Sequence, residues 1–165
     1  MGASNPVWEE HGGKSTKASY LKTGYVINED HKIFFQKLKD YHIDENNNLF
    51  LHAGFTSIHG VGKEEYKSNY YFDRTLWETV LIMDKTIQID SILYPKRLKH
   101  YNEIYIGHTP TTNYGEEFPM NKANVWNIDT GAAFIGKLTC LDIETKEFWQ
   151  SDVVQTLYPN ERGRN

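Results

Sequence analysis

The sequence predicts an α+β fold of the α/β sandwich type, in which a mixed or antiparallel sheet is flanked by helices. Short apolar runs that end at turn residues predict strands at 48–53 and 103–107. Segments 31–42 and 73–83 carry apolar residues at helical spacing, and we expect both helices to pack on the sheet. Each of the two strands runs into a histidine, so we expect a functional site at the strand ends.

Composition limits the class of protein. The 165 residues are enough for one domain with a substantial core, and we predict a single domain over 1–165. The 18 Lys and Arg residues are scattered among 22 Asp and Glu, for a net charge of -4, which argues against a nucleic-acid partner. No apolar run approaches the length of a membrane span, and the first residues lack a secretory pattern, so we expect a cytoplasmic protein without a membrane partner.

The elements before the first strand are helical. Residues 15–21 predict a short helix with a hydroxyl cap, ended by Gly24. The helix at 31–42 is predicted to cover a sheet. Its apolar side is formed by Ile33, Phe34, Leu38 and Tyr41.

The remaining elements follow the first histidine. Residues 56–69 read as a loop, after which Asp73 is expected to cap the helix that runs to about Met83. The predicted buried stripe of that helix is Leu76, Trp77, Val80 and Leu81. A long loop at 111–121 precedes three further predicted strands, of which the last two form a hairpin around Glu144–Thr145. These strands are placed at 124–128, 137–143 and 146–151. Within the second of them, the single cysteine, Cys140, is expected to be a buried apolar residue.

Two histidines are the candidate metal ligands. His52 follows one apolar strand, and His108 follows the other after a glycine. In open α/β sheets this edge is where ligands bind, and imidazole is the commonest metal ligand in proteins. A lone histidine in an apolar context is more often a hydrogen-bonded core residue than a ligand. Together, the two favour a metal site.

Several separated motifs resemble one family. The motifs are Leu51–Gly54, Ile106–Pro110, Asn127–Ala132 and Gly136–Thr139. Over nearly the whole chain they resemble the second half of a calcineurin-like metallophosphoesterase, nearest to the bacterial serine/threonine protein phosphatase branch. In addition, Trp8–Tyr20 resembles the segment that follows the Gly-Asn-His-Asp/Glu motif of these enzymes.

The resemblance implies a two-sheet fold and a particular chemistry. His52 and His108 would both bind the second of two divalent ions, Mn²⁺ or else Fe or Zn, and a metal-bound hydroxide would attack the phosphorus of a phosphoprotein or a small phosphoester. Tyr71–Arg74 resembles the aromatic-x-Arg segment whose guanidinium holds the substrate phosphate, and an arginine fork suits two phosphate oxygens. The alternative for Arg74 is a surface ion pair in the first turn of a helix. Asp129, just before Thr130–Gly131, is expected to form a turn rather than take part in catalysis.

The sequence also departs from the family. Its Gly-Asp-x-His-Gly, Gly-Asp-x-x-Asp and Gly-Asn-His motifs are absent, and they supply the first metal site, the bridging Asp and the general-acid histidine. We therefore expect the C-terminal portion of a metallophosphoesterase domain, with no catalytic residue of its own and inactive alone, whose intact parent is the enzyme. The alternative is a non-catalytic remnant that serves as a binding or assembly module. Without the other half, apolar surface would be left exposed, which favours self-association.

Overall fold

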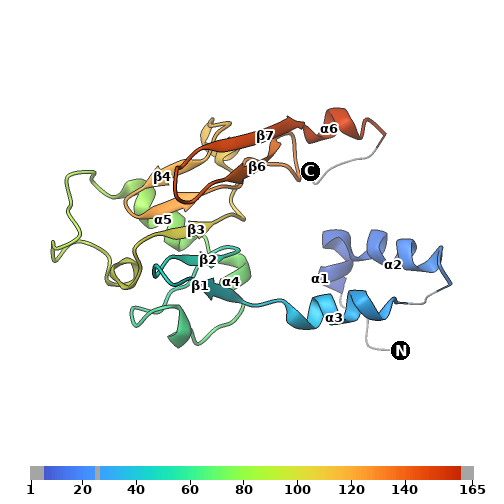
Figure 1. The fold of residues 1–165 in the computed structure, drawn as a ribbon, viewed down its shortest axis with the longest axis horizontal. Helices are drawn as coiled ribbons and strands as arrows, with labels where there is room; N and C mark the ends of the chain where they lie inside the picture. The colour runs from blue at the N-terminus through green and yellow to red at the C-terminus, as the bar shows by residue number, and fades with distance from the viewer. Residues whose placement is uncertain (1–5, 25–26, 161–165) are drawn as a thin grey trace. The chain divides into compact units, whose positions relative to one another are not determined.

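The computed structural model describes residues 6–24 and 27–160. The chain divides into two compact units, residues 1–39 and residues 40–165, which are coloured blue and cyan to red in Figure 1. We describe each unit by itself. The predicted α+β class is confirmed, because the chain combines helices with a five-stranded mixed sheet and a two-stranded sheet. The single-domain assignment stays a prediction.

The first unit is helical. The predicted helix at 15–21 is confirmed as α2, but its N-cap is Gly13 and no side chain caps it, so the expected hydroxyl cap is wrong. Gly24 closes the turn that follows the helix, with φ of 77° and its N–H donating to the Leu21 carbonyl at 3.1 Å. The described elements of this unit are α1 (Pro6–Trp8), the π-helical turn η1 (Glu9–Gly13), α2 (Lys14–Leu21) and α3 (Glu29–Lys37).

Helix α3 corrects the prediction for 31–42. It begins two residues earlier, behind an Asn28 side chain that accepts the Asp30 N–H, and it ends at Lys37. Leu38 is already extended, and Tyr41–Ile43 forms a strand instead of a last helical turn. No residue of α3 is buried within its own unit, and the expected packing of its apolar side on a sheet stays a prediction. Helical spacing identified the helix, but a strand partner determines the conformation of residues 41–43.

The second unit is built on a mixed sheet in the order β1-β2-β3-β5-β4. Strands β2, β3 and β5 run parallel, and each edge strand pairs antiparallel to its neighbour. The strands are β1 (Tyr41–Ile43), β2 (Leu49–Leu51), β3 (Ile104–Ile106), β4 (Met120–Lys122) and β5 (Val125–Asn127). The three parallel strands were predicted. The two edge strands were not, and Met120 and Asn121 of β4 belong to the segment predicted as a loop.

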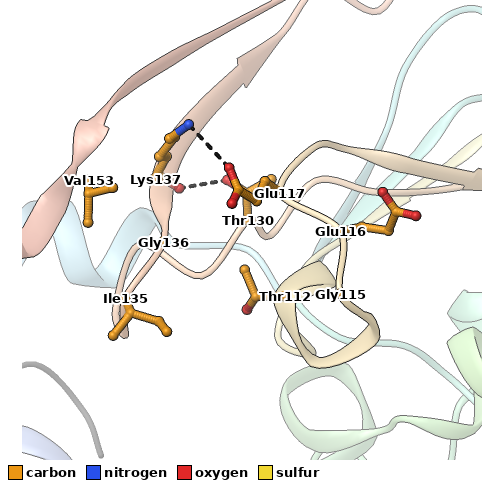
Figure 2. A pocket seen from close by; sticks show the side chains of 9 residues that line it. All are labelled: Thr112, Gly115, Glu116, Glu117, Thr130, Ile135, Gly136, Lys137 and Val153. Atoms are coloured by element: carbon orange, nitrogen blue, oxygen red, sulfur yellow. Dashed lines mark hydrogen bonds and ion pairs between the residues drawn. The ribbon is translucent and has the colours of Figure 1, made fainter.

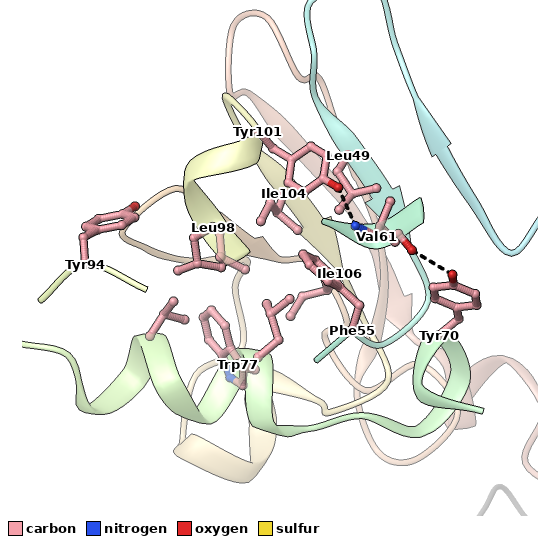
Figure 3. Packing of buried hydrophobic residues seen from close by; sticks show 13 residues of the cluster. Leu49, Phe55, Val61, Tyr70, Trp77, Tyr94, Leu98, Tyr101, Ile104 and Ile106 are labelled. Carbon is pink, nitrogen blue, oxygen red and sulfur yellow. Dashed lines mark hydrogen bonds between the residues drawn. The ribbon is translucent and has the colours of Figure 1, made fainter. Parts of the chain in front are cut away.

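The core lies between one face of this sheet and helix α5 (Thr75–Ile82). Figure 3 shows Trp77 packed toward Leu98, Phe55 and the strand residue Ile106. Of the stripe predicted for this helix, Leu76, Trp77 and Val80 are buried and Leu81 is partly buried. The predicted cap is also confirmed, since the Asp73 carboxylate accepts the N–H groups of Thr75 at 3.0 Å and Leu76 at 3.1 Å.

Short helical turns connect the strands and α5. They are η2 (Val61–Lys63), α4 (Asn69–Phe72), η3 (Lys96–His100), η4 (Thr111–Tyr114) and, near the end of the described chain, α6 (Val154–Leu157).

The predicted hairpin forms a sheet of its own. Strands β6 (Lys137–Leu141) and β7 (Phe148–Val153) form a two-stranded sheet, and Lys137 makes one further parallel bridge to Gly131. The expectation of a single sheet that includes these strands is therefore wrong. Strand β4 occupies the edge of β5, so β6 cannot pair with β5. The connecting loop spans six residues, 142–147, and the Asp142 carboxylate orders it by accepting two backbone N–H groups. Cys140 is exposed, contrary to expectation, because it lies on the outer side of this hairpin beside Trp149.

The loop between β6 and β7 contacts the face of the main sheet that is opposite the core and α5. Phe50 stacks on Tyr105 with ring centroids 5.0 Å apart, and the Lys146 ammonium lies 5.3 Å from the Tyr105 ring and 5.4 Å from the Trp126 ring. Lys146 also pairs with Glu103, whose carboxylate accepts the indole N–H of Trp126 at 3.1 Å. This combination of an ion pair and cation–π contacts fixes the loop at the opposite end of the strands from the histidines.

Candidate metal site at the strand ends

His52 and His108 meet where two neighbouring parallel strands end. Strands β2 and β3 pair in register, with Leu49 opposite Ile104, so the residues that follow them emerge at the same edge. Nε2 of His52 lies 3.1 Å from Nδ1 of His108, and the ring centroids are 5.0 Å apart. The predicted convergence of the imidazoles is therefore confirmed, whereas their role as metal ligands stays a prediction.

The backbone at His108 is strained. Its φ is +69°, and the Thr109 N–H donates to the Gly107 carbonyl at 2.8 Å, which closes a γ-turn of the rare positive-φ kind. Two hydrogen bonds hold the turn: the Gly107 N–H donates to the His52 carbonyl at 2.9 Å, and the Asn127 amide donates to the Thr109 carbonyl at 2.8 Å. Strain of this kind persists only where the surroundings impose it, and it gathers at functional sites. The turn directs the His108 ring toward His52.

The junction between α4 and α5 lies beside the histidines. The Ala53 N–H donates to the Tyr70 carbonyl at 2.9 Å, and a Cβ on Gly54 would stand 2.4 Å from an Asp73 carboxylate oxygen, so the chain after His52 packs closely on this junction. The Phe72 ring meets the His108 ring edge to face, with centroids 6.0 Å apart. Arg74 follows within the same junction and is exposed. Its phosphate-binding role stays a prediction.

Arg97 links the chain after His52 to helix α5, a role that its basic sequence context does not reveal. Its guanidinium donates to the carbonyls of Phe55 and Thr75, each at 2.8 Å, and to the Thr79 hydroxyl at 2.9 Å. Burial lowers the pKa of Arg97, although the nearby carboxylates of Asp73 and Glu64 act in the opposite direction. One side chain thus joins the chain that follows His52 to the helix that follows Arg74.

A carboxylate orders the loop that leaves His52. Glu64 accepts the backbone N–H groups of Thr56, Ser57 and Tyr66 and the side-chain amide of Asn69. Burial alone would raise the pKa of Glu64, but these hydrogen bonds, that of Thr56 first, outweigh it and lower the pKa to about 2. The ionised form of Glu64 is therefore part of the folded loop.

We expect Glu64 to make stability depend on pH in the acid range. Because its pKa falls from 4.5 to about 2 on folding, its contribution is complete above pH 4.5 and is lost as the pH falls toward 2. Since the group is partly exposed, Glu64→Gln should cost about 1–2 kcal/mol at pH 7. Urea unfolding between pH 2.5 and 7 measures this, and the variant should show a flatter pH dependence. The matched control is Glu65→Gln, an exposed neighbour, and equal behaviour of the two variants would contradict this assignment.

The two imidazole nitrogens are suitably spaced for one metal ion, but they are only part of a coordination shell. Two ligand bonds of about 2.1 Å, meeting at the angles of octahedral or tetrahedral sites, separate their nitrogens by about 2.9–3.4 Å, and the observed 3.1 Å falls in this range. Within the residues that the structure describes, no three His, Cys, Asp or Glu side chains gather closely enough to hold a metal ion. The described residues therefore provide two imidazole ligands, and water or further groups would complete the coordination.

Two other candidate features are Asp129, whose side chain lies close to Gly107, and a pocket. Asp129 is confirmed as a turn residue, since its carboxylate accepts the Gly131 N–H at 3.0 Å. A pocket of about 230 Å³ opens between η4 and the start of β6 (Figure 2), where Lys137 pairs with Glu117 at 3.5 Å. Neither predicted histidine lines it. The pocket forms where segments 112–117 and 130–137 come together, and no sequence pattern predicts this contact.

Comparison of the sequence with known proteins does not assign the chain to a family. No family model matches the sequence, and the search of curated proteins found no match either. Over the described residues, every helix is too short or too polar to pass through a bilayer. The phosphoesterase resemblance therefore stays a prediction from the sequence motifs.

Proposed function

We propose that this chain is a portion of a metal-dependent phosphoesterase, similar to the serine/threonine protein phosphatases, acting on a phosphoprotein or a small phosphoester in the cytoplasm. The observation that supports this most is the pair of imidazole nitrogens 3.1 Å apart at the ends of two parallel strands. The positive φ of His108 adds support, because a strained backbone that presents a ligand-type side chain indicates a function beyond packing.

The residues of the chain have distinct roles in this proposal. His52 and His108 each offer a ring nitrogen to the same divalent ion, Mn²⁺, Fe or Zn. A bound ion lowers the pKa of water and polarises a phosphoryl oxygen. Arg74, exposed at the start of α5, holds the phosphate through its guanidinium fork. The remaining ligands and the general acid come from the motifs that this sequence lacks.

A second function is favoured by different observations. The described residues bring together only two metal-ligand side chains at the site, and several large apolar side chains are exposed in the second unit. These include Ile92, Leu138 and Trp149. A non-catalytic remnant that binds a partner or associates with itself would have both properties.

One activity measurement distinguishes the enzyme from the non-catalytic remnant. We expect the 165-residue chain to show little Mn²⁺-dependent hydrolysis of p-nitrophenyl phosphate, and the same sequence extended upstream through the missing motifs to show substantial turnover. In the extended protein, Arg74→Ala should raise KM or lower kcat/KM through lost phosphate binding, whereas the exposed Lys85→Ala should not. An inactive extended protein that carries all the motifs would refute the enzyme proposal.

A further inference from the structure

One aromatic side chain beside the histidines is unexplained by the packing of the core. Phe72 ends helix α4 and is 67% exposed, whereas Tyr70 in the same helix is 5% exposed and belongs to the core. Single exposed apolar residues are common and need no explanation by themselves. What distinguishes Phe72 is its position, with its ring against His108 and only Asp73 between it and Arg74.

The Phe72 ring is held in place but left accessible. Helix α4 is fixed by the hydrogen bond from the Phe72 N–H to the Ser68 carbonyl at 3.0 Å and by the Ala53–Tyr70 bond described above. Two rings meet Phe72 edge to face, His108 at a centroid distance of 6.0 Å and Tyr71 at 6.4 Å. These contacts set the position of the ring while most of its surface stays open to solvent.

This arrangement gives the site a polar part and an apolar part. The histidine pair and Arg74 suit the charged phosphate of a phosphoester. The organic group on the ester oxygen must then extend away from them, and Phe72 is the large apolar side chain that contacts the histidine pair there. A flat aromatic group gains the most from such a surface, because two rings attract each other beyond the burial of apolar area.

We infer that Phe72 contacts the organic group of the substrate and gives the site a preference for phosphoesters of planar aromatic groups. This inference rests on the proposed function, since it takes the phosphate to lie at the histidine pair. It names a substrate class that the motif resemblance left open. Phe72 acts here through contact with the substrate rather than by holding His108 in place.

Equilibrium binding to the full 165-residue chain tests the inference without any need for turnover. Phenyl phosphate, methyl phosphate and inorganic phosphate are titrated in the presence of Zn²⁺, with the histidine ring protons followed by NMR. We expect phenyl phosphate to bind about 3- to 10-fold more tightly than methyl phosphate. Phe72→Ala should reduce this ratio to near one and leave the binding of inorganic phosphate unchanged. Tyr66→Ala, which removes an equally exposed aromatic ring from the loop before α4, is the matched control and should keep the ratio.

The outcomes separate the inference from the function on which it rests. An unchanged ratio in Phe72→Ala would overturn the inference and leave the proposed function standing. Equal weakening of all three ligands in Phe72→Ala would also overturn it, because it would show that Phe72 only supports His108. Failure of the wild-type chain to bind any of the three phosphates would overturn the inference, whereas the proposed function is decided by the turnover of the extended protein.

Discussion

Replacing His108 by alanine in the extended, motif-complete protein should lower Mn²⁺-dependent turnover about 100-fold or more. Loss of residues that merely support a metal ligand already costs about 10- to 100-fold in activity or affinity, and loss of the ligand itself should cost at least as much. The hydrogen bond that closes the turn at His108 joins the backbones of Thr109 and Gly107. Alanine at position 108 therefore removes the imidazole without removing this hydrogen bond. Initial rates over a range of Mn²⁺ concentrations provide the measurement.

The control for this experiment is His59→Ala. His59 is an exposed histidine of the loop that follows His52, and the same change of side chain there should leave turnover unaltered. High Mn²⁺ should partly restore the activity of His108→Ala if the loss lies in affinity for the ion. Wild-type turnover by His108→Ala at low Mn²⁺ would show that the imidazole pair does not bind the catalytic ion.

The largest loss of stability is expected from Arg97→Met. The methionine keeps most of the apolar stem, but it leaves the Phe55 carbonyl without its guanidinium donor, whereas the exposed Thr75 carbonyl still accepts from the Thr79 hydroxyl. A buried polar group that loses its partner costs about 1–3 kcal/mol, so we expect a decrease of this size in the free energy of unfolding. Urea unfolding followed by tryptophan fluorescence is a suitable measurement, because Trp77 is buried within the α5 helix that Arg97 contacts.

Lys96→Met is the matched control, since Lys96 is an exposed cation in the same short helix, η3. It should change stability by no more than about 0.5 kcal/mol, as surface substitutions usually do. Arg97→Lys should fall between the two variants, because an ammonium can reach one or two of the acceptors but lacks the planar fork. If Arg97→Met and Lys96→Met unfold at the same urea concentration, the hydrogen bonds of Arg97 contribute little.

The sequence identified the parts of the fold that carry strong local signals. The apolar runs before His52 and His108 marked the central parallel strands, and the Asp73 cap with its apolar stripe marked α5. Because parallel neighbours end at the same edge, those two strands were enough to predict that the histidines converge.

The remaining features depend on partners distant in the sequence. Strand β4 is the polar tripeptide Met120–Lys122, which has no strand pattern and is extended because β5 offers it an edge. That same pairing prevents β6 from pairing with β5. Arg97 lies in a run of basic residues that looks solvated, and only the meeting of η3 with α5 gives it the acceptors of Thr75 and Thr79. In each case the local sequence is compatible with several conformations, and a contact across the fold selects one.

The pairing of β2 with β3 also has a consequence for the order of folding. His52 and His108 are 56 positions apart in the chain, so their contact cannot form until a long intervening segment has been closed by parallel pairing. Contacts of such large sequence separation pay the loop-closure entropy first and are slow to form. The contact between the two imidazoles should therefore form late in folding, with the parallel pairing of β2 and β3. During refolding, affinity for a metal ion should appear after α5 has formed, and an ion added early should not speed the steps that precede it.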